Sequence, residues 1–204
     1  MIPAWAADLN VSRETWEAFE CYQALLEKWN PRINLVSKSA MADIGVRHML
    51  DSAQIYPFGR GVGRWVDLGS GGGFPGLVVA IMAKQDTPSR QFTLVESDIR
   101  KCAFLRTVAH ELGLNVEVIS ERAESLPKLD AEVLSARALA DLTVLFGLCE
   151  IHLAPTGRAI FLKGQSWEKE VAAARSQWSF DVDAHKSKTN PNAAVLVFKD
   201  IARV

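Results

Sequence analysis

Apolar positions in the first part of the chain follow helical spacing. Between residues 12 and 29 they recur every three or four positions, which predicts an amphipathic helix. The dipeptide that contains Pro31 predicts the end of this helix. A second helix is expected over residues 40–56, and the glycine-rich stretch 59–63 predicts a flexible connection into the first strand.

From residue 64 onward, short apolar runs alternate with helical stretches. The runs that predict strands cover residues 64–68, 91–96, 115–120, 130–137 and 157–163. The helices expected between and after them begin at Pro75 and cover residues 99–112, 139–153 and 167–177. The apolar face of the 99–112 helix is expected to be buried and to begin at Ile99. Two last runs, 180–185 and 194–199, predict a terminal hairpin. This alternation predicts an α/β fold whose parallel sheet is covered on both faces.

Composition places the chain among ordinary globular proteins. Its 204 residues, 49% hydrophobic and 23% charged, predict a single domain over residues 1–204, with a helical extension (1–60) before an α/β core (61–204). No apolar run is long enough to span a membrane, and the N-terminus lacks a signal-peptide pattern. We therefore expect a soluble, cytoplasmic protein.

Charge and cysteine content narrow the chemistry further. The formal net charge of −1 gives no overall sign of nucleic-acid binding. Cys21, Cys102 and Cys149 are far apart in apolar helical contexts, so we expect buried free thiols and no disulfide or metal site.

The glycine-rich stretch from Asp67 to Gly76 carries the clearest functional signal. An apolar strand containing one acidic residue runs into this loop, and an apolar helix follows at Pro75. Glycines let the backbone turn sharply and approach a ligand, while a helix start offers N–H groups to a carboxylate or phosphate. The stretch therefore predicts a ligand-binding turn.

Two cofactors fit the spacing of this loop. Residues 71–76 match the G-x-G-x-x-G pattern with Glu96 twenty residues further on, which suits NAD. Side chains at Phe74 and Pro75 would block the close approach of a pyrophosphate. The other register begins with Asp67, which can bond the loop or a cationic group of S-adenosylmethionine, while Glu96 can accept from its ribose. The spacing favours S-adenosylmethionine, with NAD, or a fold that binds neither, as alternatives.

Charged residues end or follow five of the predicted strands. They are Asp67, Glu96, Glu124, Arg137 and Lys163. In parallel sheets, ligands bind outside the carboxyl ends of the strands, so we expect these side chains to lie along one functional edge.

Two further polar residues lie in the predicted 40–56 helix. His48 and Asp51 are three positions apart, so they would share a face and could pair. From this spacing, a surface pair or a cap between helices is the plainer interpretation.

Seven short motifs together resemble a known family, the bacterial 16S ribosomal RNA guanine-N7 methyltransferases, also called the glucose-inhibited division protein B family. The resemblance covers about residues 16–200 and rests on Asn34-Leu35-x-Ser37, His48-x-x-Asp51-Ser52, Asp67-Leu68-Gly69-Ser70-Gly71-Gly72-Gly73-Phe74-Pro75-Gly76, Glu96-Ser97, Arg122-Ala123-Glu124, Ser135-x-Arg137-Ala138 and Leu162-Lys163-Gly164. Val36 stands where the family usually has Thr, and Gly72 where it has Ala or Pro. The resemblance implies a class I (Rossmann-like) methyltransferase fold: a seven-stranded, mostly parallel sheet with an N-terminal helical extension.

The resemblance also implies a cofactor site for S-adenosylmethionine. Its residues would be Gly69, Phe74, Glu96, Ala123, Glu124 and Arg137, to which the spacing of the glycine loop adds Asp67 and Gly71. In this assignment, Gly69 and Phe74 line the methionine end and Glu96 holds the ribose. The adenine lies beside residues 123 and 124, and Arg137 faces the cofactor and the incoming base.

The substrate that the resemblance implies is one guanosine in the decoding-region loop of 16S rRNA, in the small ribosomal subunit. Guanine N7 already carries an in-plane lone pair, so no general base is expected and Arg137 is assigned a positioning role. The substrate rim would contain Asn34, Ser37, His48, Asp51 and Lys163. Phe74 is either a stacking platform for the base or a core residue beneath the loop. We expect a monomer.

Other functions remain open at this point. They are a methyltransferase acting on a non-RNA substrate, an NAD-binding oxidoreductase, and an RNA-binding assembly factor that transfers no methyl group.

Overall fold

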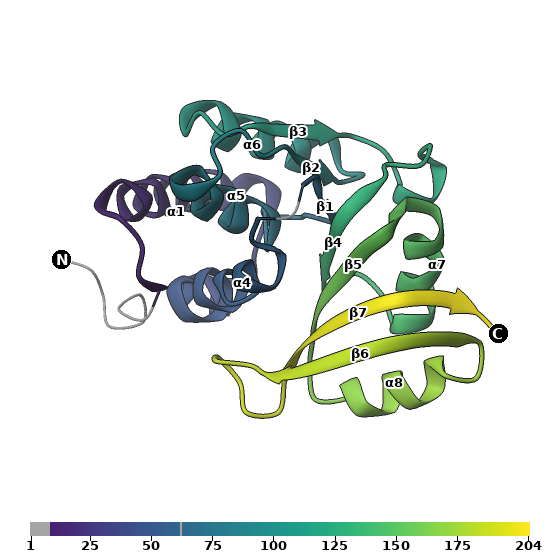
Figure 1. Cartoon of the computed structure of the whole chain (residues 1–204). Helices are drawn as coiled ribbons and strands as arrows, with labels where there is room; N and C mark the ends of the chain where they lie inside the picture. The colour runs from purple at the N-terminus through teal and green to yellow at the C-terminus, as the bar shows by residue number, and fades with distance from the viewer. Residues whose placement is uncertain (1–8, 62) are drawn as a thin grey trace.

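The computed structural model describes residues 9–61 and 63–204, so Val62 in the predicted connection lies outside the described residues (Figure 1). Helices form the N-terminal part: α1 (Arg13–Ile33), α2 (Lys38–Met41), the π-helical turn η2 (Gly45–Leu50), α3 (Asp51–Ala53) and α4 (Tyr56–Gly59). The expected 40–56 helix is thus divided into short pieces. Its π-helical turn contains His48 and leads directly into Asp51.

Helix α1 starts as predicted and ends later than predicted. The Ser12 hydroxyl caps it by accepting from the Thr15 N–H. Pro31 lies inside the last turn, where the loss of one N–H is tolerated close to the helix end. Asn34 then ends the helix in the left-handed conformation, with φ 52° and its N–H bonded to the Asn30 carbonyl.

Seven strands form one sheet in the order β3-β2-β1-β4-β5-β7-β6 (Figure 1). Their bounds are β1 Trp65–Leu68, β2 Phe92–Val95, β3 Val116–Ile119, β4 Ala131–Arg137, β5 Leu153–Lys163, β6 Trp178–Lys186 and β7 Ala194–Arg203. Strands β1 to β5 pair in parallel, and β7 runs antiparallel to β5 and β6. The predicted α/β architecture and the terminal hairpin are confirmed.

Helices cover both faces of this sheet. They are α5 (Gly76–Asp86), α6 (Ile99–Glu111), α7 (Leu142–His152) and α8 (Trp167–Ala174), with a 3₁₀ turn at Ala123–Ser125. Helices α1, α5 and α6 share one buried cluster, in which Tyr22 and Leu26 of α1 pack with Leu77 of α5. Helix α7 packs with Trp178 and Phe198 of β6 and β7 in a second cluster. The N-terminal helices are therefore part of the main hydrophobic core.

Two burial predictions are wrong. Ile99 is 74% exposed because it is the first residue of α6, which the Asp98 side chain caps immediately after β2, before the helix lies on the sheet. Cys21 is exposed because it faces away from the side of α1 that Phe19 and Tyr22 bury. Cys102 and Cys149 are buried, and all three cysteines are free.

Residues 9–61 and 63–204 were compared with the requirements of a membrane-spanning helix and of a metal-binding cluster. None of their helices combines the length and apolar character needed to cross a bilayer. No group of three His, Cys, Asp or Glu side chains in residues 9–61 and 63–204 is placed to hold a metal ion.

Candidate functional site

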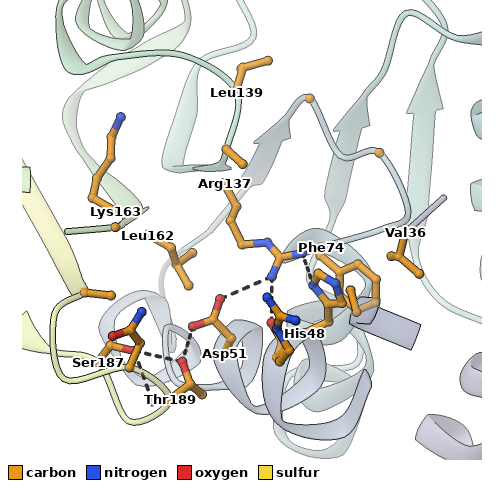
Figure 2. Close-up of a pocket in the computed structure, with 18 of the residues that line it drawn as sticks. Val36, His48, Asp51, Phe74, Arg137, Leu139, Leu162, Lys163, Ser187 and Thr189 are labelled. Carbon is orange, nitrogen blue, oxygen red and sulfur yellow. Dashed lines mark hydrogen bonds and ion pairs between the residues drawn. The ribbon is translucent and has the colours of Figure 1, made fainter. Parts of the chain in front are cut away.

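A pocket of about 970 Å³ opens at the carboxyl ends of β1, β4 and β5. Part of its wall comes from the helical segment around α2, η2 and α3, and part from the connection between β6 and β7 (Figure 2). Eight of the predicted site residues line it: Ser37, His48, Asp51, Gly69, Gly71, Phe74, Arg137 and Lys163. The structure thus brings together residues from four distant parts of the sequence.

The strand ends lie along one edge as expected. The strand order places Glu124, Glu96, Asp67, Arg137 and Lys163 in that succession along the sheet. Glu96, Ala123 and Glu124, together with Asp67 and Asn34, are not among the residues that line the pocket. The pocket therefore occupies the middle of this edge.

Asp67 lies beneath the glycine loop rather than in the pocket. Its fully buried carboxylate accepts from the Gly76 N–H at 3.1 Å and from the Ser135 hydroxyl at 2.6 Å. The Trp65 indole N–H donates to the same hydroxyl at 2.8 Å. Burial raises the pKa of Asp67 to about 6, against the hydrogen bonds that favour its ionised form. The sequence allowed Asp67 to bond either the loop or a cationic group of the cofactor, and in the structure it bonds the loop.

The loop amides are nearly all used within the protein. Glu96 accepts from the Gly71 N–H and the Asp98 N–H, each at 2.9 Å. Gly73 and Phe74 donate to the Ser70 carbonyl. Over residues 69–76, Gly72 alone keeps an N–H without an acceptor among the described residues. The expectation of several free N–H groups is therefore wrong, and this one amide remains for a ligand.

Arg137 is held by three acceptors of the helical segment formed by η2 and α3 (Figure 2). Its guanidinium contacts His48 Nδ1 at 2.6 Å, Asp51 Oδ2 at 3.3 Å and the Arg47 carbonyl at 3.2 Å. It also lies 5.1 Å from the centre of the Phe74 ring. His48 and Asp51 thus meet through Arg137, so the plainer prediction of a surface pair is wrong.

His48 is an uncharged acceptor in this arrangement. Burial lowers its pKa to about 4, and the positive charges of Arg137 and Arg47 act in the same direction. Because guanidinium N–H groups only donate, Nδ1 must accept, which assigns the ring proton to Nε2. The imidazole stacks on Phe74, with ring centres 4.8 Å apart.

Phe74 is a core residue beneath the loop. Its side chain is 4% exposed and contacts His48, Tyr22 and Arg137. The Tyr22 hydroxyl donates to the Gly72 carbonyl at 2.5 Å, which ties α1 to the loop. A ring covered in this way offers no free face for a base, so the stacking-platform alternative is not supported.

The remaining predicted rim residues have structural partners. Lys163 lines the pocket, but its ammonium group bonds Glu170 at 2.7 Å and the Ala140 carbonyl at 2.6 Å. The Ser37 hydroxyl caps α2, and Asn34 is the exposed C-cap of α1. Of the five predicted rim residues, only His48 and Asp51 contact Arg137.

Three residues near the carboxyl ends of the strands belong to none of the sequence motifs. Thr189 donates to Asp51 at 2.7 Å, and Gln54 donates to the same oxygen at 2.9 Å. His152, fully buried at the end of α7, contacts the Ala123 carbonyl through Nε2 at 2.8 Å. Thr189 and His152 are far from these partners in sequence, whereas Gln54 is three residues from Asp51, a helical spacing that could have suggested the contact.

Comparison with known proteins points to one family. The family model of rRNA small subunit methyltransferase G (GidB) matches residues 15–194. Among curated proteins, Ribosomal RNA small subunit methyltransferase G of Ruegeria pomeroyi is 52% identical over 204 residues, with both chains fully covered.

Solved structures share the fold at low sequence identity. A methyltransferase from Geobacter sulfurreducens aligns with a TM-score of 0.56 at 14% identity, covering 90% of this chain and 88% of that one. Pyrococcus horikoshii TYW2, in complex with MeSAdo, aligns with a TM-score of 0.53 at 11% identity, covering 76% of this chain and 62% of that one. The implied methyltransferase fold is confirmed, and the chain belongs to the rRNA small subunit methyltransferase G family.

Proposed function

We propose that this protein transfers the methyl group of S-adenosylmethionine to N7 of one guanosine in the decoding-region loop of 16S rRNA. Family membership supports the reaction class and the RNA substrate. The observation that carries the proposal is the single pocket that the glycine loop and the Arg137 cluster line together. A cofactor bound at the glycine loop and a base held by Arg137 would meet in this pocket.

The residues present fit S-adenosylmethionine. The unpartnered Gly72 N–H can donate to its methionine carboxylate. Each Glu96 oxygen has accepted one backbone N–H and keeps lone-pair capacity for the ribose hydroxyls. Residues 123 and 124 follow β3 at the same edge, where they would border the adenine. Asp67 acts indirectly, because it shapes the loop through Gly76. When bound, the cofactor supplies an electrophilic sulfonium methyl group.

The substrate atom needs no deprotonation. Guanine N7 has an in-plane lone pair, so catalysis consists of holding it in line with the methyl group at ~3–3.5 Å. The most prominent candidate base in the pocket is already engaged, since His48 uses Nδ1 to accept from Arg137. The protein therefore contributes by orienting the guanine toward the methyl group, and no side chain has to transfer a proton in this step.

Arg137 is the residue that positions the base. An arginine has more N–H donors than its three contacts use, so it can still bond a substrate group. A hydrogen bond to guanine N7 would block the nucleophile, which leaves guanine O6, a phosphate or the cofactor carboxylate as its partner. His48 and Asp51 hold it in place, while Ser37, Asn34 and Lys163 belong to the outer rim.

The whole chain acts as one domain in this proposal. The N-terminal helices share the core of the sheet, and α1 contacts the glycine loop through Tyr22. The N-terminal helical extension therefore forms part of the site. We propose that the protein acts as a monomer in the cytoplasm, where small ribosomal subunits are its partner.

The test uses methyl-labelled S-adenosylmethionine with unmethylated small subunits or with naked 16S rRNA. Label is then mapped by cleavage chemistry selective for N7-methylguanine. We expect one labelled guanosine in the decoding-region loop. Cofactor binding without label in RNA would contradict the RNA substrate and favour a methyltransferase with another substrate. Binding of NADH that S-adenosylmethionine does not displace would favour the oxidoreductase alternative.

A further inference from the structure

The connection between β6 and β7 is bonded to the helical segment that holds Arg137. The Gln54 side-chain carbonyl accepts from the Lys188 N–H at 2.8 Å, and its amide donates to the Ser187 hydroxyl at 3.3 Å. The Thr189 hydroxyl donates to Asp51 Oδ1 at 2.7 Å. Residues near the C-terminus therefore reach the wall of the pocket (Figure 2).

The two carboxylate oxygens of Asp51 have different partners. Oδ1 accepts from Thr189 and Gln54, whereas Oδ2 faces the guanidinium of Arg137 at 3.3 Å. A carboxylate is a rigid plane, so fixing Oδ1 from two directions also fixes Oδ2. The hydroxyl at position 189 is thus one of two groups that set the orientation in which Asp51 meets Arg137.

We propose that Thr189 is a positioning residue, which acts through Asp51 to hold Arg137 in the orientation that methyl transfer requires. The inference rests on the proposed function, because it assigns Arg137 the task of holding the base or its RNA backbone. It adds the β6–β7 connection to the active site, 138 residues from Asp51 in sequence.

A structural role alone does not account for this arrangement. Thr189 is partly exposed in a short connection, and its hydroxyl also contacts the Ser187 hydroxyl at 3.0 Å, so the connection keeps local hydrogen bonds of its own. Removing the Thr189 hydroxyl would leave the fold intact, but Gln54 would then be the one side chain that still holds Asp51 Oδ1, so the carboxylate could turn relative to Arg137.

The test compares three variants of the full-length protein. Thr189→Val removes the hydroxyl and keeps the shape, Thr189→Ser keeps the hydroxyl, and Thr107→Val removes a partly buried hydroxyl on α6 that bonds only its own helix, at the Ala103 carbonyl. Readouts are kcat/KM with small subunits, the Kd of S-adenosylmethionine and the melting temperature.

We expect Thr189→Val to lower kcat/KM about fivefold to tenfold, the effect of losing one hydrogen bond of ordinary strength. The Kd of the cofactor and the melting temperature should match those of Thr107→Val. Thr189→Ser should stay within about twofold of the wild type. Equal kcat/KM in Thr189→Val and Thr107→Val would overturn the proposal, as would a loss that follows melting temperature alone.

A double-mutant cycle separates action through Asp51 from a direct effect. In an Asp51→Asn background, Thr189→Val should cause no further loss, because the oriented carboxylate is already gone. Multiplicative losses in the double variant would contradict the proposal. If the wild type transferred no methyl group to small subunits, the proposed function itself would fail, so the two failures are distinguishable.

Discussion

Two parts of the pocket lining are built in different ways. One is the glycine loop, called the loop wall here, and the other is Arg137 with His48 and Asp51, called the Arg137 wall. Behind the loop wall, Asp67 and Glu96 accept from backbone N–H groups that lie 9 and 25 residues away in sequence. On the Arg137 wall, the guanidinium bonds two side chains that lie 86 and 89 residues away, Asp51 and His48, and one backbone carbonyl, that of Arg47. Backbone anchoring makes the first wall part of the fold, whereas the second wall depends on a few side-chain atoms. Disruption should therefore affect folding or cofactor binding on one side and turnover on the other.

The largest effect is expected from Asp67→Ala. It removes a fully buried carboxylate and leaves the Gly76 N–H and the Ser135 hydroxyl without their acceptor. Two unsatisfied donors and a small cavity should lower the free energy of unfolding by about 3–4 kcal/mol. Urea denaturation measures this, with the exposed Asp183→Ala as control. A loss below about 1 kcal/mol would show that the loop does not depend on this anchor.

Arg137→Lys tests the Arg137 wall. Lysine keeps the charge but cannot reach three acceptors with a planar fork of donors. We expect kcat to fall about 100-fold, which equals about 2.7 kcal/mol, while the Kd of S-adenosylmethionine changes less than threefold. Single-turnover transfer and equilibrium binding separate the two quantities. If the Kd rose as much as kcat fell, Arg137 would belong to the cofactor wall.

The raised pKa of Asp67 predicts a pH dependence of stability. A folded-state pKa of about 6, above the unfolded value, means that the native state binds this proton more tightly. Its stabilising contribution is present below about pH 4 and is lost as pH rises through 6. Relative to Asp67→Asn, the wild type should lose about 2–3 kcal/mol between pH 4 and pH 7. Parallel stability curves for the two proteins would contradict the assignment.

Glu96→Gln should weaken the cofactor complex about tenfold. One oxygen becomes an amide that points donors at the Gly71 or Asp98 N–H, and an acceptor for the ribose is lost. Calorimetric titration measures the Kd, and Glu117→Gln on the exposed side of β3 is the matched control. At saturating cofactor, kcat should change less than threefold. A larger fall in kcat with unchanged Kd would move Glu96 to the substrate side.

No change is expected in the protonation of His48 near neutral pH. Because its pKa is lowered to about 4, its ring should stay neutral with the proton on Nε2 between pH 5.5 and 8. Nitrogen-resolved NMR of the imidazole reports this directly. A titration step within that range would mean that Arg137 is not held as described.

The difference between the two walls also explains which parts of the site could be predicted from the sequence. The strand, glycine loop and helix from Asp67 to Gly76 are contiguous, so one stretch encodes both the turn and its anchor. The strand-end rule also placed Arg137 at the functional edge. The side chains that hold it were only partly predictable: motif resemblance brought in His48 and Asp51, while Thr189 carries no pattern.

Other errors have local physical causes. A helix was expected to be continuous over residues 40–56, yet a π-helical turn and short helices replace it and place His48 and Asp51 toward Arg137. The partner of Lys163 could not be predicted either, because periodicity does not show that Glu170 on the following helix binds its ammonium group.

One measurement tests the central claim, that the loop wall binds the cofactor and the Arg137 wall directs methyl transfer to the RNA. Wild-type protein and Arg137→Lys are each preloaded with methyl-labelled S-adenosylmethionine, mixed with unmethylated small subunits, and sampled during a single turnover. We expect equal preloading of the two proteins. N7-methylguanosine should form at one position in the decoding-region loop, about 100-fold more slowly with the variant. Equal transfer rates, or label on any other RNA position, would contradict the central claim.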